Sequence, residues 1–287
     1  MDVSIIIVNY NTKHLLEDCL SSLYALTQSI DFEVIVVDNA SSDDSETYIT
    51  RKFPQVKWIN SGENIGFGRA NNLGAKYADG KYLLLLNSDT LLLNNAIKAF
   101  YDYAETHSEE QIGALGGWLV DSNHNSNSSY GYFPSPCADI QYLLQNCILK
   151  KKLHHEIEMN VDYIIGADMF VLKKVFEELG GFDSNFFMYY EETDLQYRMA
   201  QNGYVRRIIV TPHIVHLEGG SFSIKGLTLS RFIMAQRSYN YYLRKHYKGI
   251  KYAVYKTILC LLRLTLFVTT RWNFVEKITA YKVVLNG

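Results

Sequence analysis

The 287-residue chain contains few cysteines, and their spacing matches no common cysteine motif. The four are Cys19, Cys137, Cys147 and Cys260, and no two of them form a CxxC pair. This pattern argues against a disulfide framework and against a zinc site, and it is typical of a protein in a reducing cytosol. A strand-like run follows Met1 directly, so we expect no signal peptide ahead of it.

The chain also lacks the glycine fingerprints of two nucleotide-binding folds. Its glycine-rich stretch, NIGFGRANNLG at residues 64–74, does not match GxGxxG and follows the third predicted strand instead of the first. A dinucleotide-binding fold is therefore not indicated. No GxGT-type loop follows the first strand, which argues against a nucleotidyltransferase. We expect the glycines to let the backbone approach a ligand closely.

Composition and charge divide the chain into two parts. Apolar residues make up 48% of it, which suffices for a sizeable core and argues against disorder. Residues 1–224 contain 16 Lys and Arg and 29 acidic residues, a net charge of −13. Residues 225–287 contain 12 Lys and Arg and one acidic residue, a net charge of +11. We predict a globular domain over 1–224 and a basic, amphipathic helical tail over 225–287.

Hydrophobic patterning in the first third alternates between strands and helices. Continuous, β-branched apolar runs predict buried strands at residues 3–8, 33–37, 56–59 and 82–86. Helical spacing or capping predicts helices at 14–26, after 44, and at 67–77. This order is that of βαβ units, so the fold class is α/β with a mostly parallel sheet flanked by helices.

The remainder of the chain is less regular. The pattern predicts a helix at 94–107, a polar loop at 121–136, a strand-like segment at 161–172, a helix at 191–201, and short strands at 205–210 and 213–215. From residue 227 onward every segment has a helical pattern, and no internal repeat occurs.

Polar residues end each of the first four predicted strands. They are Asn9, Asp38, the turn from Asn64 to Gly66, and Asn87 with Asp89. Because the carboxyl ends of parallel strands meet along one edge, we expect these groups to converge where open α/β sheets place their ligands. Amide and carboxylate groups there suit the base and ribose of a nucleotide. The alternative is that Asn and Asp simply terminate strands and cap helices.

One of these strand ends has the chemistry of a metal site. Asp89 lies two residues after Asn87, and Mg²⁺ or Mn²⁺ commonly bridges a carboxylate to a diphosphate. His216 and Glu218 follow a later short strand and could complete the site. The alternative for His216 is an ordinary packed or solvated histidine.

Acidic residues cluster at the start of the helix predicted at 191–201. Glu191, Glu192 and Asp194 lie within four residues, where the helix dipole favours negative charge. The dipole alone could account for them. The acids follow five bulky residues at 186–190, however, and a carboxylate beside an apolar wall is a candidate general base.

Together these segments resemble the family 2 glycosyltransferases with the GT-A fold, and within them the bacterial rhamnosyltransferase-like branch. The resemblance covers most of residues 3–221. The matching segments, in the family's order, are SIIIVNYNT, EVIVVDNASSDDS, NIGFGRANNLGAKYADGKYLLLLNSDT, IIGADMFVLKKVFEELGGFDSNFFMYYEETDLQYRMAQNGY and VHLEGGS.

The resemblance implies roles for the donor-binding residues. Asp38 would hold the base of the donor nucleotide, with Asn9, Asn64 and Gly66 nearby. The segment 87–89 takes the place of the family's DXD motif. Its first acid is asparagine here, so Asp89 would carry the metal contact.

The resemblance also implies a second metal ligand, a general base and a segment that lines the sugar and acceptor pocket. His216 would be the second protein ligand of the metal. Glu192 occupies the position of the general base, where the family usually has Asp after Glu, so Glu191 remains an alternative. The segment 166–168, including Asp168, would line the sugar and acceptor pocket.

The implied activity is that of an inverting glycosyltransferase dependent on Mg²⁺ or Mn²⁺. In such an enzyme a carboxylate deprotonates the acceptor hydroxyl, and the cation stabilises the departing nucleoside diphosphate. For this branch the expected donor is dTDP-rhamnose, and the expected acceptor is a saccharide, lipid-linked, in surface polysaccharide synthesis. A UDP-hexose donor and an inactive sugar-nucleotide-binding protein remain alternatives. No nucleic-acid partner is expected.

The tail contains the most apolar run of the chain, at residues 253–270. The run is about long enough to span a bilayer, but Lys256 and Arg263 interrupt it. We therefore predict an interfacial helix that holds the protein on the inner face of the cytoplasmic membrane. The residues expected to insert are Ile258, Leu259, Leu262 and Leu266. The alternatives are a helix packed on the domain and a dimer contact.

Overall fold

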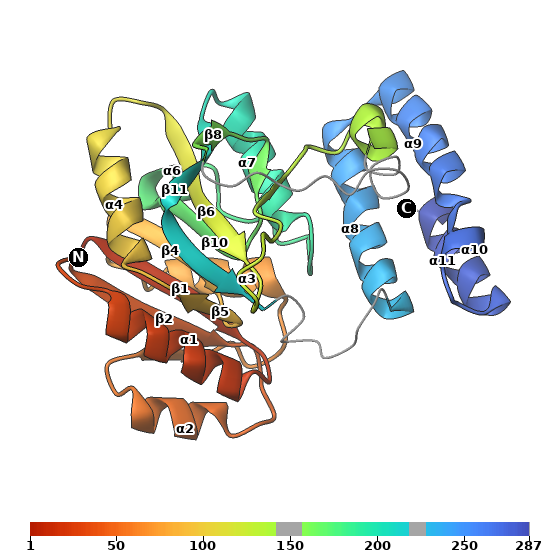
Figure 1. The fold of residues 1–287 in the computed structure, drawn as a ribbon. Coiled ribbons are helices and arrows are strands. Elements are labelled where there is room, and N and C mark those ends of the chain that lie inside the picture. The colour runs from red at the N-terminus through yellow and green to blue at the C-terminus, as the bar shows by residue number, and fades with distance from the viewer. Residues whose placement is uncertain (142–156, 218–227, 287) are drawn as a thin grey trace.

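The computed structural model describes residues 1–141, 157–217 and 228–286 (Figure 1). Its strands are β1 (Val3–Asn9), β2 (Phe32–Asp38), β3 (Lys57–Asn60), β4 (Tyr82–Asn87), β5 (Thr90–Leu92), β6 (Ile112–Val120), β7 (Tyr130–Gly131), β8 (Met159–Asn160), β9 (Tyr163–Ile164), β10 (Asp168–Leu172) and β11 (Val205–His216). Its helices are α1 (Lys13–Leu26), α2 (Ser45–Lys52), α3 (Phe67–Ala75), α4 (Ala96–Thr106), α6 (Lys173–Glu178), α7 (Glu191–Gln201), α8 (Leu229–His246), α9 (Gly249–Arg263), α10 (Leu266–Thr269) and α11 (Phe274–Asn286).

The central sheet of the described chain runs in the order β3-β2-β1-β4-β10-β6-β11-β5. The pairs β1–β2, β1–β4 and β2–β3 are parallel, which confirms the predicted βαβ arrangement of the first four strands. β10 runs antiparallel to β4 and β6, and β5 runs antiparallel to β11. The carboxyl ends of β1, β2 and β4 therefore lie side by side on one edge of the sheet.

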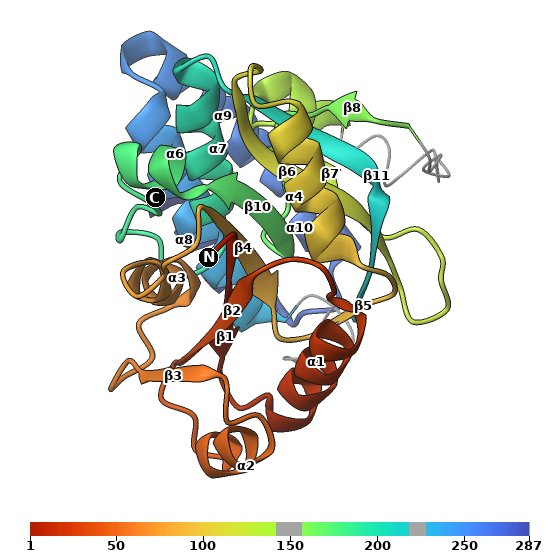
Figure 2. The same cartoon turned by 90° about the vertical axis from the view of Figure 1, so that its left-hand side faces the viewer.

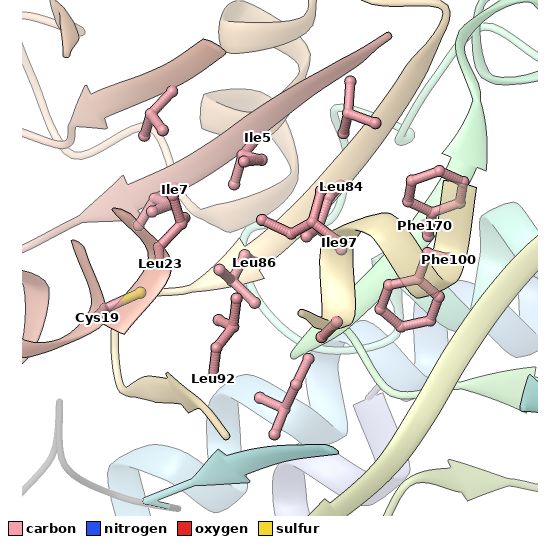
Figure 3. Packing of buried hydrophobic residues seen from close by; sticks show 14 of the residues in the cluster. Ile5, Ile7, Cys19, Leu23, Leu84, Leu86, Leu92, Ile97, Phe100 and Phe170 are labelled. Carbon is pink, nitrogen blue, oxygen red and sulfur yellow. The ribbon is translucent and has the colours of Figure 1, made fainter. Parts of the chain in front are cut away.

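Helices cover both faces of this sheet, which is why the runs of β1, β2 and β4 are apolar throughout. Figure 2 shows α1 and α4 on one side of the sheet, with α3 and α6 on the other. On the first side, the ring of Phe100 from α4 stacks on Phe170 of β10 at a centroid distance of 5.4 Å (Figure 3). Leu23 of α1 and Ile7 of β1 belong to the same buried cluster.

The pattern of the sequence missed one central strand. No strand was expected at β6, although β6 lies between β10 and β11. Its segment IGALGGWLV is rich in glycine, which lowers strand propensity. The glycines are needed by the packing, because a Cβ on Gly116 would lie 2.4 Å from Cγ2 of Ile164. The short strand β5 was also not expected.

Two other expectations need correction. The two strands expected at 205–210 and 213–215 form one strand, β11, whose pairing with β6 shifts register between Ile208 and His213. Pro212 lies in this irregular stretch, where a strand tolerates a residue without an N–H group. The loop expected at 121–136 contains the short strand β7, which pairs with β9.

The C-terminal segment is helical, as predicted, and its helices α8 to α11 form a separate layer beside the domain (Figure 1). α8 contacts the segment that precedes α7. The hydroxyl of Ser238 donates a hydrogen bond of 2.8 Å to the carbonyl of Met188, and the ring of Tyr241 packs edge-on against Phe186. α9 and α11 pack in turn on α8.

The tail presents a different apolar face from the one we expected. Leu259 and Leu266 are buried within the helical layer, and Ile258 and Leu262 are partly buried. The strongly exposed apolar side chains of α9 and α10, including the turn between them, are Ile250, Val254, Leu261, Leu264 and Val268. They recur at spacings of three, four and seven residues, so they share one face of the helix.

Candidate active site

The carboxyl ends of β1, β2 and β4 open onto a cavity of about 500 Å³. Its walls come from the ends of these strands, the turn before β10, the segment leading into α7, the end of β11, and α8. Six of the residues predicted from the sequence line it: Asn64, Asn87, Asp89, Glu191, Glu192 and His216. The other four do not line it: Asn9, Asp38, Gly66 and Asp168.

Asn9 and Asp38 join the ends of β1 and β2 beneath this cavity. The amide of Asn9 donates a hydrogen bond of 2.7 Å to Oδ1 of Asp38, and its carbonyl accepts one from Thr12. The other carboxylate oxygen of Asp38 accepts a hydrogen bond from the backbone N–H of Ser41. Both side chains are buried, so the structure gives them a role in ordering the strand ends. The contact between Asp38 and a nucleotide base stays a prediction.

Asn39, which follows Asp38 at the end of the second predicted strand, organises the next wall of the cavity. Its amide donates to Oδ1 of Asn64, and its own Oδ1 accepts from the backbone N–H of Ile65. Gly66 follows with a φ of +83°, and a Cβ there would lie 2.1 Å from the carbonyl oxygen of Phe187. The close approach at Gly66 is therefore to protein backbone, whereas we expected it to be to a ligand.

The turn after β4 is held rigidly. The Thr90 hydroxyl donates to the carbonyl of Asn87 at 2.7 Å, and the N–H of Leu217 donates to the carbonyl of Asp89 at 3.0 Å. Because β5 pairs with the end of β11, His216 lies opposite Thr90. Nε2 of His216 is consequently 3.5 Å from Oδ1 of Asp89 and 3.4 Å from the amide nitrogen of Asn87.

The pair formed by Asp89 and His216 fits a divalent cation that is shared with a substrate. Both residues line the cavity, and they offer one carboxylate and one imidazole. Within the described chain, no group of three or more His, Cys, Asp and Glu side chains could hold a metal ion. Magnesium and similar hard cations often bind through one or two protein groups plus substrate phosphates, so two protein ligands suffice.

A strained turn places the acids of α7. Tyr189 and Tyr190, which precede the helix, have φ values of 70° and 67°, in the left-handed region that non-glycine residues rarely adopt. Each such residue costs on the order of 1 kcal/mol and is retained where the surroundings determine it. The turn brings Glu191 and Glu192 to the cavity wall at the first two positions of the helix.

The two glutamates differ in environment. Burial, followed by the charge of Glu192, raises the pKa of Glu191 well above its ordinary value. Burial also raises the pKa of Glu192, although backbone N–H groups at the helix start oppose the rise. Glu191 is only 3% exposed and packs beside Gly68, whereas Glu192 is partly exposed. A general base must be ionised when it acts, and the partly exposed position of Glu192 suits that role better than the buried position of Glu191.

Asp168 does not occupy the position that we expected. Gly166 and Ala167 line the cavity, but Asp168 is fully buried behind them. Its Oδ2 accepts a 2.7 Å hydrogen bond from the N–H of Gly117 on β6. Burial raises its pKa to about 7, while this hydrogen bond and the nearby His216 act in the opposite direction. The alternation of side chains along β10 turns Asp168 away from the cavity.

Sequence reasoning missed the contribution of α8 to the cavity wall, which consists of Arg231 and Met234. No local signal distinguishes them from the other residues of a basic helix. Glu218, the third residue considered for the metal, lies outside the described residues.

A model of the family described as glycosyl transferase family 2 matches residues 4–180. A low-salt glycan biosynthesis hexosyltransferase of Haloferax volcanii is 27% identical, over 69% of this chain and 61% of that protein. The N-acetylglucosaminyl-diphospho-decaprenol L-rhamnosyltransferase of Mycobacterium tuberculosis is 24% identical, over 74% of this chain and 75% of that protein. A dTDP-rhamnosyl transferase of Shigella flexneri is 24% identical, over 94% and 90%.

Solved structures of low sequence identity share the fold. A mannosyltransferase from Pyrobaculum calidifontis, in complex with GDP-Man and Mn²⁺, is 18% identical with a TM-score of 0.59, over 99% of this chain and 75% of that one. GalNAc-T7 with UDP, GalNAc and Mn²⁺ is 14% identical with a TM-score of 0.66, over 100% of this chain and 54% of that one. The mixed sheet with helices on both faces is thus the GT-A fold, and the chain belongs to glycosyl transferase family 2 and resembles its rhamnosyltransferases.

Proposed function

We propose that this glycosyltransferase moves L-rhamnose from dTDP-rhamnose to a lipid-linked saccharide, with inversion at the anomeric carbon. One observation carries the proposal of transfer: Asp89, His216 and Glu192 come from three separate segments and line one cavity. The relatives named for rhamnosyl transfer support the choice of donor, and the mycobacterial relative's diphospho-decaprenol acceptor supports the class of acceptor.

In the proposed reaction, Glu192 accepts the proton of the acceptor hydroxyl as its oxygen attacks the anomeric carbon of the sugar. The bond between that carbon and the diphosphate oxygen breaks, and the electron pair leaves with the nucleoside diphosphate. The raised pKa of Glu192 makes it a stronger base than an exposed glutamate once it is ionised. A single displacement requires no covalent nucleophile and inverts the anomeric configuration.

Asp89 and His216 would hold the divalent cation. When bound, Mg²⁺ or Mn²⁺ supplies charge stabilisation for the diphosphate. The rigid turn after β4 keeps the two protein ligands together before substrate binds, which reduces the ordering that binding requires.

The exposed apolar face of the tail supports a place for the enzyme at the membrane. Within the described residues, Gly249–Thr269 is the helix that is long and apolar enough to cross a bilayer by length and composition, and 17% of its window is buried. Exposed basic residues lie on the same helical layer, including Lys248, Lys251 and Arg271. We propose that this face lies on the inner leaflet of the cytoplasmic membrane, where a lipid-linked acceptor is presented.

A turnover assay on a panel of nucleotide sugars tests the proposal directly. The full chain would be incubated with Mn²⁺, a diphospholipid-linked saccharide and dTDP-rhamnose, UDP-glucose, UDP-GlcNAc or GDP-mannose in turn. We expect product only with dTDP-rhamnose, with a new glycosidic bond of inverted configuration by NMR. Turnover with a UDP-hexose and not with dTDP-rhamnose would show that the proposed donor is wrong. If nucleotide sugars bind but none is turned over, the result would favour a sugar-nucleotide-binding protein without activity.

A further inference from the structure

The tail contributes directly to the active-site cavity. α8 begins at Leu229, and its N-cap residue Thr228 accepts a hydrogen bond from the backbone N–H of Arg231. Arg231 and Met234 are three residues apart, so they share one face of the helix, and both line the cavity. The boundary that we predicted at residue 224 therefore separates two parts that build one site.

The charge of the cavity makes Arg231 distinctive. Three acidic residues line the cavity: Asp89, Glu191 and Glu192. Among the described residues, Arg231 is the only lysine or arginine in its wall. Both substrates in the proposed reaction carry a diphosphate group, which the acids alone would repel. The planar guanidinium of arginine matches phosphate oxygens in pairs and remains charged over the whole working pH range.

Arg231 shares the cavity wall with Tyr189. Burial raises the pKa of Tyr189, and the positive charge of Arg231 opposes this rise. Tyr189 lies in the strained turn that leads into Glu191 and Glu192. Arg231 is thus placed on the side of the cavity that holds the proposed base.

Ion pairs anchor the C-terminal end of α8 to Asp194 of α7 and to Asp183, and Arg231 lies in the first turn of the same helix. Nζ of Lys245 lies 2.7 Å from Oδ1 of Asp194 and 2.7 Å from Oδ2 of Asp183. Nε2 of His246 lies 2.8 Å from the same oxygen of Asp194, which is fully buried. Side chains on fixed helices hold substrates with less loss of entropy than side chains on loops.

We propose that Arg231 binds a diphosphate group in the cavity, either that of the nucleotide sugar or that of a lipid diphosphate carrying the acceptor. The inference rests on the proposed use of diphosphate-bearing substrates. If Arg231 binds diphosphate, α8 is part of the substrate site. The basic tail then has a role in substrate binding in addition to its proposed role at the membrane.

Binding measurements test this without any need for turnover. The variants are Arg231→Gln, Arg231→Lys, and the control Arg237→Gln, whose side chain is exposed on the same helix and outside the cavity. The full chain with Mg²⁺ would be titrated calorimetrically with dTDP and with geranyl diphosphate. Thymidine and geraniol, which lack the diphosphate, serve as matched ligand controls.

We expect Arg231→Gln to bind one of the two diphosphates at least tenfold more weakly than the parent does. The affinity of Arg231→Lys should be intermediate, and that of Arg237→Gln should be unchanged. Loss confined to dTDP assigns the donor, and loss confined to geranyl diphosphate assigns the acceptor. If both diphosphates bind Arg231→Gln within twofold of the parent, the proposal is wrong. Thermal unfolding checks that each variant is folded. If Arg231→Gln is unstable, the comparison with the parent is made with Arg231→Lys instead. An error in the proposed donor sugar would appear only in the turnover assay on nucleotide sugars, and it would leave these binding measurements unchanged.

Discussion

Oδ1 of Asp89 lies 3.5 Å from Nε2 of His216, although the two residues come from opposite halves of the chain. The antiparallel pairing of β5 with the end of β11 brings them together, with His216 opposite Thr90. One carboxylate and one imidazole therefore face the cavity as a preformed pair. The first prediction follows from this geometry.

Asp89→Ala and His216→Ala should each lose Mn²⁺-dependent binding of nucleoside diphosphate and reduce transfer at least a hundredfold. The reason is that each removes one of the two protein ligands proposed for the cation. Mn²⁺ binding can be followed by electron paramagnetic resonance, independently of activity. His213→Ala, an exposed histidine on the same strand, should bind Mn²⁺ as the parent does. Full activity of Asp89→Ala in the presence of a chelator would contradict the proposal that Asp89 binds a cation required for transfer.

Glu192→Gln should reduce kcat by about 10² to 10⁴, since the amide keeps the shape of the side chain and cannot accept a proton. Binding of the donor should persist, which calorimetry can check. Glu191→Gln should retain far more activity, because burial raises the pKa of Glu191 and disfavours the ionised form that a base requires. If Glu191→Gln is the inactive variant and Glu192→Gln is active, the base assignment is wrong by one residue.

Glu191 should make the stability of the fold depend on pH. Burial raises its pKa in the folded state, so its contribution is fully present below the ordinary value of 4.5 and is lost as the pH rises through the raised value. Glu191→Gln should therefore be more stable than the parent at pH 8, and the gain should vanish as the pH falls to about 4.5. Thermal unfolding across this range measures the difference. A constant difference at all pH values would contradict the prediction.

Asp194→Ala should destabilise the protein by about 3–5 kcal/mol, because it removes the fully buried carboxylate on which the neighbouring basic side chains converge. Asp194 is fully buried and contacts Arg198, Lys245 and His246. The matched control is Asp102→Ala, which removes an ion pair with Lys98 on the surface of α4 and should cost at most about 0.5 kcal/mol. Urea unfolding of both variants gives the comparison. Equal effects would mean that the α7–α8 contact is not a major source of stability.

The triple variant Ile250→Ser, Leu261→Ser and Val268→Ser should bind anionic liposomes at least tenfold more weakly than the parent. These side chains are exposed, so their loss removes apolar contact with lipid at little cost to folding. Leu93→Ser, an exposed leucine of the domain, is the control and should bind as the parent does. High salt should reduce the parent's binding only in part, because the apolar contribution is not screened.

Sedimentation with liposomes that contain phosphatidylglycerol measures this binding. A parent protein that never sediments with them, or a triple variant that still does, would rule out the membrane face. Substitution is preferable to deletion of the tail, because α9 and α11 pack on α8 and α8 lines the cavity.

The sequence by itself determined the first four strands and the acids that follow them. Long β-branched runs can be stable only inside a sheet covered on both faces, and parallel strands must bring their carboxyl ends to one edge. For that reason the order of apolar and polar residues is sufficient to place Asn87 and Asp89 at the edge of the sheet where the cavity opens. Glu191 and Glu192 are identifiable from their position after five bulky residues.

Only the tertiary structure decided the remaining features, because they depend on contacts between distant segments. β6 is a central strand in spite of its glycines, since Gly116 gives room to Ile164. Asp168 is buried because β10 turns its side chain toward Gly117 of β6. The helical period of the tail gave several apolar faces, and packing of Leu259 and Leu266 selected which one is exposed. Arg231 lines the cavity because α8 packs beside the segment that leads into α7, and no local pattern in the chain encodes that packing.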